Sequence, residues 1–126
     1  MKRGFIAILT VIALLAFALS LTVAVTYLSI NESQSGLALS RGAAALSITE
    51  GCAEDVLLLA RRDANYAGGT YGYLSGTCTV TVSKNATIWI VDVSGTKDNF
   101  TRAVRIIFDY VPGPPGIITL QSWLEQ

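Results

Sequence analysis

The chain opens with MKRGFIAILTVIALLAFALSLTVAVTYLSI (residues 1–30), in which Lys2 and Arg3 are the only charged side chains. Residues 5–30 are mostly apolar, with scattered threonine and serine. A helix that crosses a bilayer needs about 20 predominantly apolar residues. The stretch is therefore long enough to span a membrane, and it is longer than the apolar core of a typical secretory signal peptide.

The charges beside this stretch predict an orientation. Lys2 and Arg3 precede it, and basic residues tend to stay on the cytoplasmic side of a membrane. We therefore expect a single-pass membrane protein with a cytoplasmic N-terminus and an extracytoplasmic head. The two cysteines, Cys52 and Cys78, then lie in a compartment where disulfides form and persist.

Three interpretations of the N-terminus compete. In the first, a secretory signal peptide is cut after Ala18, which leaves residues 19–30 as an apolar end on a secreted binding domain. In the second, the apolar stretch is a single-span envelope anchor that is never cut, and the head binds a partner. In the third, the cut comes before the apolar stretch, between Gly4 and Phe5.

The leader MKRG followed by FIAIL resembles a type IV prepilin-like signal, in which a short basic leader ends in glycine and an apolar helix begins with phenylalanine. The resemblance implies that a prepilin peptidase cuts after Gly4 and methylates Phe5. Residues 1–4 would be the leader, and residues 5–30 the membrane anchor and later the filament core. The implied partners are other pilin-like subunits, an inner-membrane assembly platform and, before assembly, membrane lipid.

One residue departs from this family pattern. Most members carry glutamate at the fifth mature position, and here that position is Leu9. The resemblance then implies a minor, initiating or tip subunit of a type IV pilus-like or type II secretion-like filament, on the cell surface or in the periplasm. The side chains expected to pack in the assembly helix are Ile6, Leu9, Ile12, Leu15, Leu19 and Val23.

Residues 31–64 are predicted to be the amphipathic half of the same helix. Apolar residues recur there at spacings of three and four, which is typical of one helix face: Ala45, Ile48, Cys52, Val56 and Leu59. Because glycine weakens a helix, residues 31–36 are the expected place for a kink or a melted turn. A helix over residues 5–62 would be on the order of 85 Å long.

Residues 65–126 are predicted to form an antiparallel β head. Alternating or β-branched stretches indicate strands at residues 77–82, 86–93 and 101–110, with a short edge strand at 117–123. Residues 92–99 are expected to form a turn, and residues 66–73 a flexible glycine-rich connector. The predicted fold class is α+β, with a long N-terminal helix packed on a small antiparallel sheet.

Cys52 and Cys78 are predicted to join the two halves of the head. Cys52 lies in the apolar stripe of the helix, and Cys78 lies on the apolar face of the first clear strand. Both would then point at one interface, which favours a disulfide. Two buried free thiols are the alternative. A bridge would close a loop of about 27 residues and stabilise a small core by roughly 3–4 kcal/mol.

A metal site has only a weak candidate. Asp92, Ser94, Thr96 and Asp98 have the alternate spacing of oxygen ligands in a calcium loop. Lys97 occupies the position where an EF-hand needs glycine. A polar hairpin turn is therefore the simpler interpretation of these residues.

The composition argues against catalysis and against nucleic-acid binding. The chain has no histidine, which is the commonest general base, and no triad, zinc or phosphate-loop motif. Its formal net charge is zero, so no strong field attracts nucleic acid. The sequence predicts a structural subunit without enzyme activity or cofactor.

Overall fold

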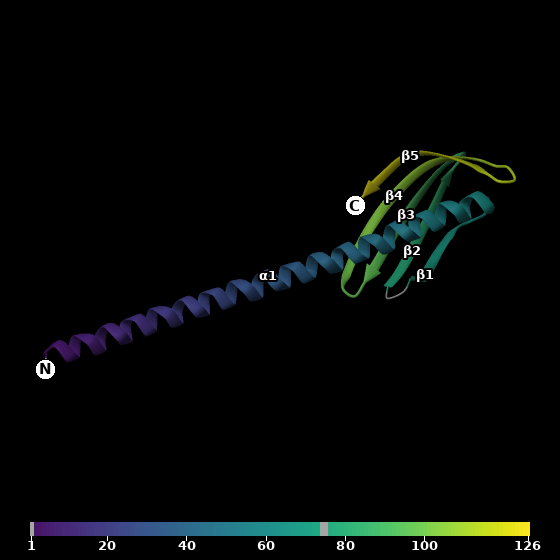
Figure 1. Cartoon of the computed structure of the whole chain (residues 1–126). Helices are drawn as coiled ribbons and strands as arrows, with labels where there is room; N and C mark the ends of the chain where they lie inside the picture. The colour runs from purple at the N-terminus through teal and green to yellow at the C-terminus, as the bar shows by residue number, and fades with distance from the viewer. Residues whose placement is uncertain (1, 74–75) are drawn as a thin grey trace. The chain divides into compact units, whose positions relative to one another are not determined.

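The computed structural model describes residues 2–73 and 76–126, so Met1 of the expected leader lies outside the described residues (Figure 1). The described residues form one α-helix and one five-stranded sheet. The elements are α1 (Lys2–Arg62), β1 (Gly68–Tyr73), β2 (Gly76–Asn85), β3 (Ile88–Lys97), β4 (Phe100–Val111) and β5 (Ile117–Glu125). The predicted α+β class, a long N-terminal helix with an antiparallel sheet packed on it, is confirmed.

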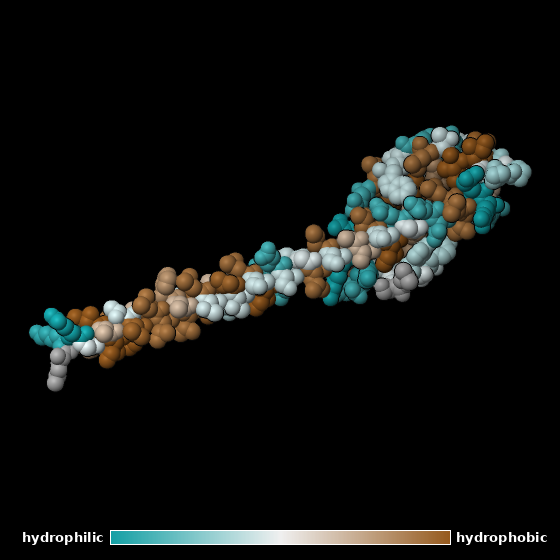
Figure 2. Space-filling view, viewed as in Figure 1, coloured by the Kyte–Doolittle hydropathy of each residue, from teal (hydrophilic) through white to brown (hydrophobic). Residues whose placement is uncertain are grey.

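The chain divides into two units, Met1–Ala38 and Leu39–Gln126. The first consists of helix from Lys2 onward, and Figure 2 shows the apolar side chains along it. Residues 31–36 are helical, so the melted turn expected there is wrong. Extending an existing helix adds one hydrogen bond per residue, and this outweighs the modest penalty of a single glycine at Gly36.

The second unit, called the head below, contains the sheet and the helix residues 39–62. Its strands pair only with their neighbours in sequence, in the order β1-β2-β3-β4-β5, and every pair is antiparallel. Two-residue turns join β2 to β3 and β3 to β4. Ala86 and Asp98 take up the left-handed backbone of these turns, each with φ 53°. The predicted meander is therefore present, with tighter connections than expected.

Three boundaries predicted from the sequence are wrong. β3 continues to Lys97, so the turn expected at residues 92–99 shrinks to Asp98 and Asn99. Ala86 belongs to a turn and not to the second strand. Gly68–Tyr73, expected to be a flexible connector, is β1, because its backbone pairs along β2 from Thr81 to Gly76. Polar residues and glycine do not indicate which face of a strand is buried. The sequence of a strand rich in them therefore shows no clear alternation.

The helix end covers one face of the sheet (Figure 1). The core lies between them and contains apolar side chains from both. From α1 these are Cys52, Ala53, Val56 and Ala60, and from the strands Cys78, Val80, Trp89, Val91, Val93, Val104, Ile106, Phe108 and Tyr110. The alternation predicted for the strand at 101–110 is confirmed, because every second residue from Val104 to Tyr110 is buried.

The buried face of the helix is rotated slightly from the predicted one. Ala45, Cys52 and Val56 are buried as expected, whereas Ile48 is only half-buried and Leu59 is 37% exposed. Thr49 and Ala60 are buried at the interface between helix and sheet in place of Ile48 and Leu59. Hydropathy favours the larger side chains, but close approach of a helix to a sheet favours small ones.

The helix and the sheet approach each other closely at Gly95 in β3. A Cβ added to Gly95 would overlap Thr49 Oγ1, and it would come within 2.9 Å of the Thr49 nitrogen and 3.1 Å of the Ala45 oxygen. The Thr49 hydroxyl lies 2.8 Å from the Ala45 oxygen and 3.2 Å from the Arg102 oxygen. Thr49 is 0% exposed, and the two carbonyl partners explain why its hydroxyl is tolerated in the core.

Gly95→Val is expected to destabilise the head by about 1–3 kcal/mol, because the added side chain must push α1 away from β3. Gly72→Val is the matched control, since a Cβ at Gly72 in β1 would meet no atom within 4 Å. Urea unfolding of both variants, followed by tryptophan fluorescence, measures the difference. Equal stability of the two variants would contradict the close approach.

Candidate functional site

The expected processing site lies in the first turn of the described helix. Gly4 has no atom near the position of a Cβ, and Phe5 is 69% exposed. No contact in the described residues shields this junction from an enzyme. Cleavage itself is not visible in the structure and remains a prediction.

The helix of the first unit is apolar on all sides. Large side chains between residues 5 and 30 are exposed by 51% at Leu21 to 72% at Tyr27. One 18-residue window has a mean hydropathy of 2.7 and is 0% buried, so this segment is long and apolar enough to cross a membrane. A helix that is apolar on every side needs lipid or other protein around it.

The residues predicted for assembly lie on this surface. Ile6, Leu9, Ile12, Leu15, Leu19 and Val23 are all more than half exposed. They do not form a separate seam, because Ile8, Leu14, Phe17 and Val25 are equally exposed. The sequence therefore located the apolar surface but did not distinguish one packing face within it.

Four hydroxyl groups in this segment are satisfied within the helix. Thr10 and Ser20 donate to carbonyl oxygens three residues earlier, and Thr22 and Thr26 to oxygens four residues earlier. Each distance is 2.8 Å. Unsatisfied polar groups are costly in hydrocarbon. These side chains are therefore compatible with an apolar surrounding.

The predicted disulfide is present in the head. Cys52 on α1 and Cys78 on β2 are bonded, with their Cα atoms 6.5 Å apart. Both residues are almost completely buried, at 1% and 0% exposure. The bridge fastens the helix to the strand next to the sheet edge, as the two apolar faces predicted.

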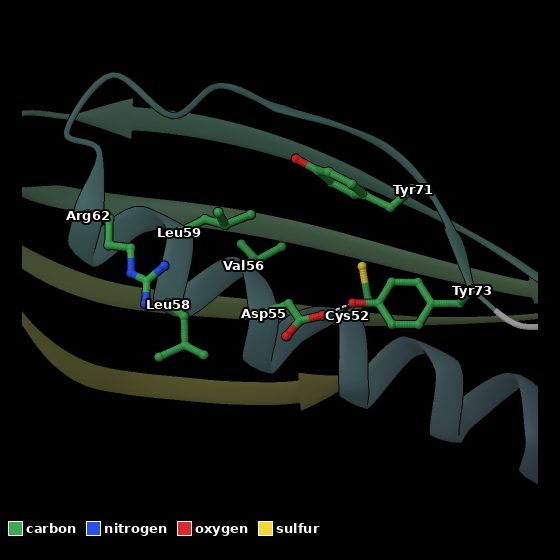
Figure 3. A pocket seen from close by; sticks show the side chains of 8 residues that line it. All are labelled: Cys52, Asp55, Val56, Leu58, Leu59, Arg62, Tyr71 and Tyr73. Atoms are coloured by element: carbon green, nitrogen blue, oxygen red, sulfur yellow. Dashed lines mark hydrogen bonds between the residues drawn. The ribbon is translucent and has the colours of Figure 1, made fainter.

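A hollow of about 280 Å³ opens between the end of α1 and β1 (Figure 3). Its lining is mainly apolar: Cys52, Val56, Leu58 and Leu59, with Tyr71 and Tyr73 from β1 and the charged side chains of Asp55 and Arg62. The Tyr73 hydroxyl donates to the Asp55 carboxylate across the hollow, as Figure 3 shows. The hollow contains no histidine, because the chain has none.

A tyrosine pair lies next to this hollow. The hydroxyl oxygens of Tyr66 and Tyr71 are 2.9 Å apart and share a hydrogen bond. Burial, followed by the hydrogen bond and charge of Tyr71, raises the pKa of Tyr66 far above that of a free tyrosine. Tyr66 is therefore protonated at physiological pH and acts as a packing and hydrogen-bonding group.

The calcium candidate is contradicted. Asp92, Ser94 and Thr96 lie on the extended strand β3, and only Asp98 lies in the turn. A strand rises about 3.3 Å per residue, so their side chains spread along it and do not surround one point. Both Asp92 oxygens are occupied by Arg105, at 2.7 and 3.1 Å. Asp92 correspondingly raises the pKa of Arg105.

The residues described contain no group of three or more acidic or cysteine side chains placed to hold a metal ion. No family model, curated protein or solved structure matches this chain. What the chain does is therefore inferred from its residues and their geometry.

Sequence reasoning missed a set of contacts at the helix end. Lys84 donates to the Ala64 oxygen at 2.9 Å, and its ammonium group lies 4.0 Å from the centre of the Trp89 ring. The Gly116 nitrogen donates to the Arg61 oxygen at 3.1 Å, and Arg61 Nε donates back to the Gly116 oxygen. The Lys84–Ala64 and Arg61–Gly116 contacts join residues 20 and 55 positions apart, so no local pattern indicates them.

Proposed function

We propose that the chain is a pilin-like structural subunit, cut after Gly4 and assembled through its apolar helix into a type IV pilus-like or type II secretion-like filament. The observation that carries this proposal is the helix of the first unit, whose large apolar side chains are all more than half exposed. Such a surface is unstable in water. It requires a bilayer first, and it can later be covered by the same helix of other subunits.

The leader supports processing before the apolar stretch. A cut after Ala18 would leave residues 19–30 at the N-terminus of a secreted product. Leu19, Leu21, Val23 and Val25 are more than half exposed there, so this product would carry an uncovered apolar end. A cut after Gly4 leaves the whole apolar segment, residues 5–30, in the mature chain, where lipid or other subunits can cover it.

The head supports a structural role. Its core is small and is closed by a disulfide, which suits an extracytoplasmic compartment. Leu9 cannot supply the carboxylate that most members of the family carry at this position. We therefore propose a minor or initiating subunit, whose partners are a prepilin peptidase, other pilin-like subunits and an assembly platform in the membrane.

Mass spectrometry of the N-terminus, on protein from the producing cells, tests the proposal. A product that begins with methylated Phe5 supports prepilin processing. A product that begins near Leu19 would identify a secreted head domain. A product that retains Lys2, in cells that process other prepilins, would identify a simple membrane anchor.

Gly4→Leu is expected to abolish cleavage and filament entry, because the peptidase pocket would have to accept a bulky side chain next to the cut bond. Membrane insertion should be unchanged, since an apolar residue is added to an apolar helix. Gly36→Leu is the matched control, because Gly36 is a helical glycine with equally open surroundings. Normal cleavage of Gly4→Leu would refute the proposed processing site.

A further inference from the structure

The end of α1 carries an exposed leucine between two hollows. Leu58 is 54% exposed and lines both of them. One is the hollow beside β1 described above. The other lies on the β5 side of the helix, where its apolar lining also includes Leu57, Ile118 and Leu120. Leu58 is thus an exposed apolar side chain on the outward face of the helix, with a depression on each side.

Each hollow also contains one acid and one base from α1. Asp55 and Arg62 line the hollow beside β1, and Glu54 and Arg61 line the hollow beside β5. All four residues are exposed. The charges therefore flank Leu58 symmetrically, with acids one turn before it and bases one turn after it.

The acids and bases are too far apart to pair within one chain. Glu54 precedes Arg61 by seven residues, and Asp55 precedes Arg62 by the same number. Seven residues correspond to about 10.5 Å along a helix and to nearly two turns, so each acid and its base share a face. The ion pairs in the described part of the chain, Arg102–Glu125 and Arg105–Asp92, leave these four charges out.

Gly51 precedes Leu58 by seven residues, which is the same spacing that separates each acid from its base. A Cβ at Gly51 would meet no atom within 4 Å, so nothing in the described head requires a glycine there. Glycine is a poor helix former. Its presence leaves a gap on the helix surface, one repeat away from an exposed leucine.

We propose that this helix face packs against the same face of a second copy of the chain, parallel to it and shifted by seven residues. The shift places Leu58 of one copy over Gly51 of the other. It also places Arg61 against Asp55 and Arg62 against Glu54, because each flank of the face meets the opposite flank of the other copy in a parallel pair. One displacement therefore fills the gap and matches both pairs of opposite charges.

The parallel direction rests on the proposed function, which anchors neighbouring copies in one membrane by the same end of the chain. An unshifted parallel pair would set acids against acids and bases against bases, which is unfavourable. The seven-residue shift removes this repulsion. The charges consequently select the stagger, and Leu58 packed at Gly51 supplies the apolar contact.

Photo-crosslinking from position 58 tests the geometry. The full chain, with photoreactive benzoylphenylalanine in place of Leu58, is expressed in the producing cells and irradiated. Mass spectrometry then locates the crosslinked peptide. The expected product is a dimer linked to the segment that contains Gly51 of the other copy. A crosslink to residues around position 58 of the other copy, or only to a different protein, would overturn the inference.

Gly51→Leu in the same crosslinking chain is expected to lower the dimer yield at least about tenfold, which corresponds to about 1.4 kcal/mol. The head should unfold at the same or a higher temperature, because leucine is a better helix former than glycine. Gly51→Ala is the conservative control and should keep most of the dimer. Loss of dimer without loss of stability separates packing between copies from folding.

Charge reversal supplies the complementary test. Glu54→Arg and Arg62→Glu should each lower the dimer yield, and reversal of all four charges together should restore it. Lys97→Glu is the control, because Lys97 lies beside the β3–β4 turn, two residues from Gly95 and away from the helix end. If the chain is processed and assembles equally well with and without these charge changes, the result overturns the proposed packing but not the proposed function. A chain that is neither processed nor assembled would overturn both the packing and the proposed function.

Discussion

Cys52→Ala together with Cys78→Ala is expected to lower the free energy of unfolding of the head by about 3–4 kcal/mol. The two cysteines are 26 positions apart, so the bridge removes much of the freedom of that loop in the unfolded chain. The bonded sulfurs also fill buried space, since both residues are at most 1% exposed. A domain of this size is marginally stable, so a loss of this magnitude would leave much of the head unfolded.

Urea unfolding of the full chain in detergent micelles measures this effect. Trp89 is a suitable probe because it is 3% exposed in the folded head and would become solvated. Reduction of the unmodified chain with dithiothreitol should shift the midpoint in the same direction. A loss below about 1 kcal/mol, in the double variant and after reduction alike, would contradict a stabilising role of the bridge.

Phe108→Ala is expected to cost about 3–5 kcal/mol, the usual range for removing a fully buried ring. Phe108 lies in β4 under the helix and is 0% exposed. Its ring centre is 5.6 Å from that of Trp89, and the Trp89 ring centre is 4.7 Å from that of Tyr110, with both pairs of rings tilted by 36°. Phe108 belongs to one core cluster with side chains of the helix and of the other strands, so the cavity left by alanine cannot close easily.

Ile107→Ala is the control for this prediction. Ile107 precedes Phe108 in the same strand but points to the opposite face, where it is half-buried. We expect a loss of about 1 kcal/mol for Ile107→Ala. Urea unfolding under the same conditions compares the two, and similar losses would contradict the placement of the core on the helix side of the sheet.

The regular parts of the fold could be predicted because their signals are local. The uninterrupted apolar stretch of residues 5–30 indicates a helix that needs lipid or partners, and the alternation from Val104 to Tyr110 indicates a strand with one buried face. The disulfide could be predicted because Cys52 lies on the apolar face of the helix and Cys78 on the apolar face of a strand. Each inference needs only the spacing of residues along one element.

The remaining features could not be predicted because they depend on contacts between elements. Whether Thr49 or Ile48 faces the sheet is decided by Gly95, which lies 46 residues after Thr49. Gly68–Tyr73 becomes a strand because β2 offers it a paired edge. The apparent calcium spacing of Asp92 and its neighbours disappears because β3 extends, and Arg105 on the adjacent strand then takes the carboxylate.

The strand order has a consequence for how the head forms during synthesis. Every strand after β1 pairs with the one that precedes it in the chain, so each of them finds its partner edge already present when it emerges. The two cysteines also precede β3, β4 and β5 in the chain. Oxidation can therefore join the helix to β2 while the last three strands are still being delivered. The head can fold by successive addition, without waiting for its C-terminus.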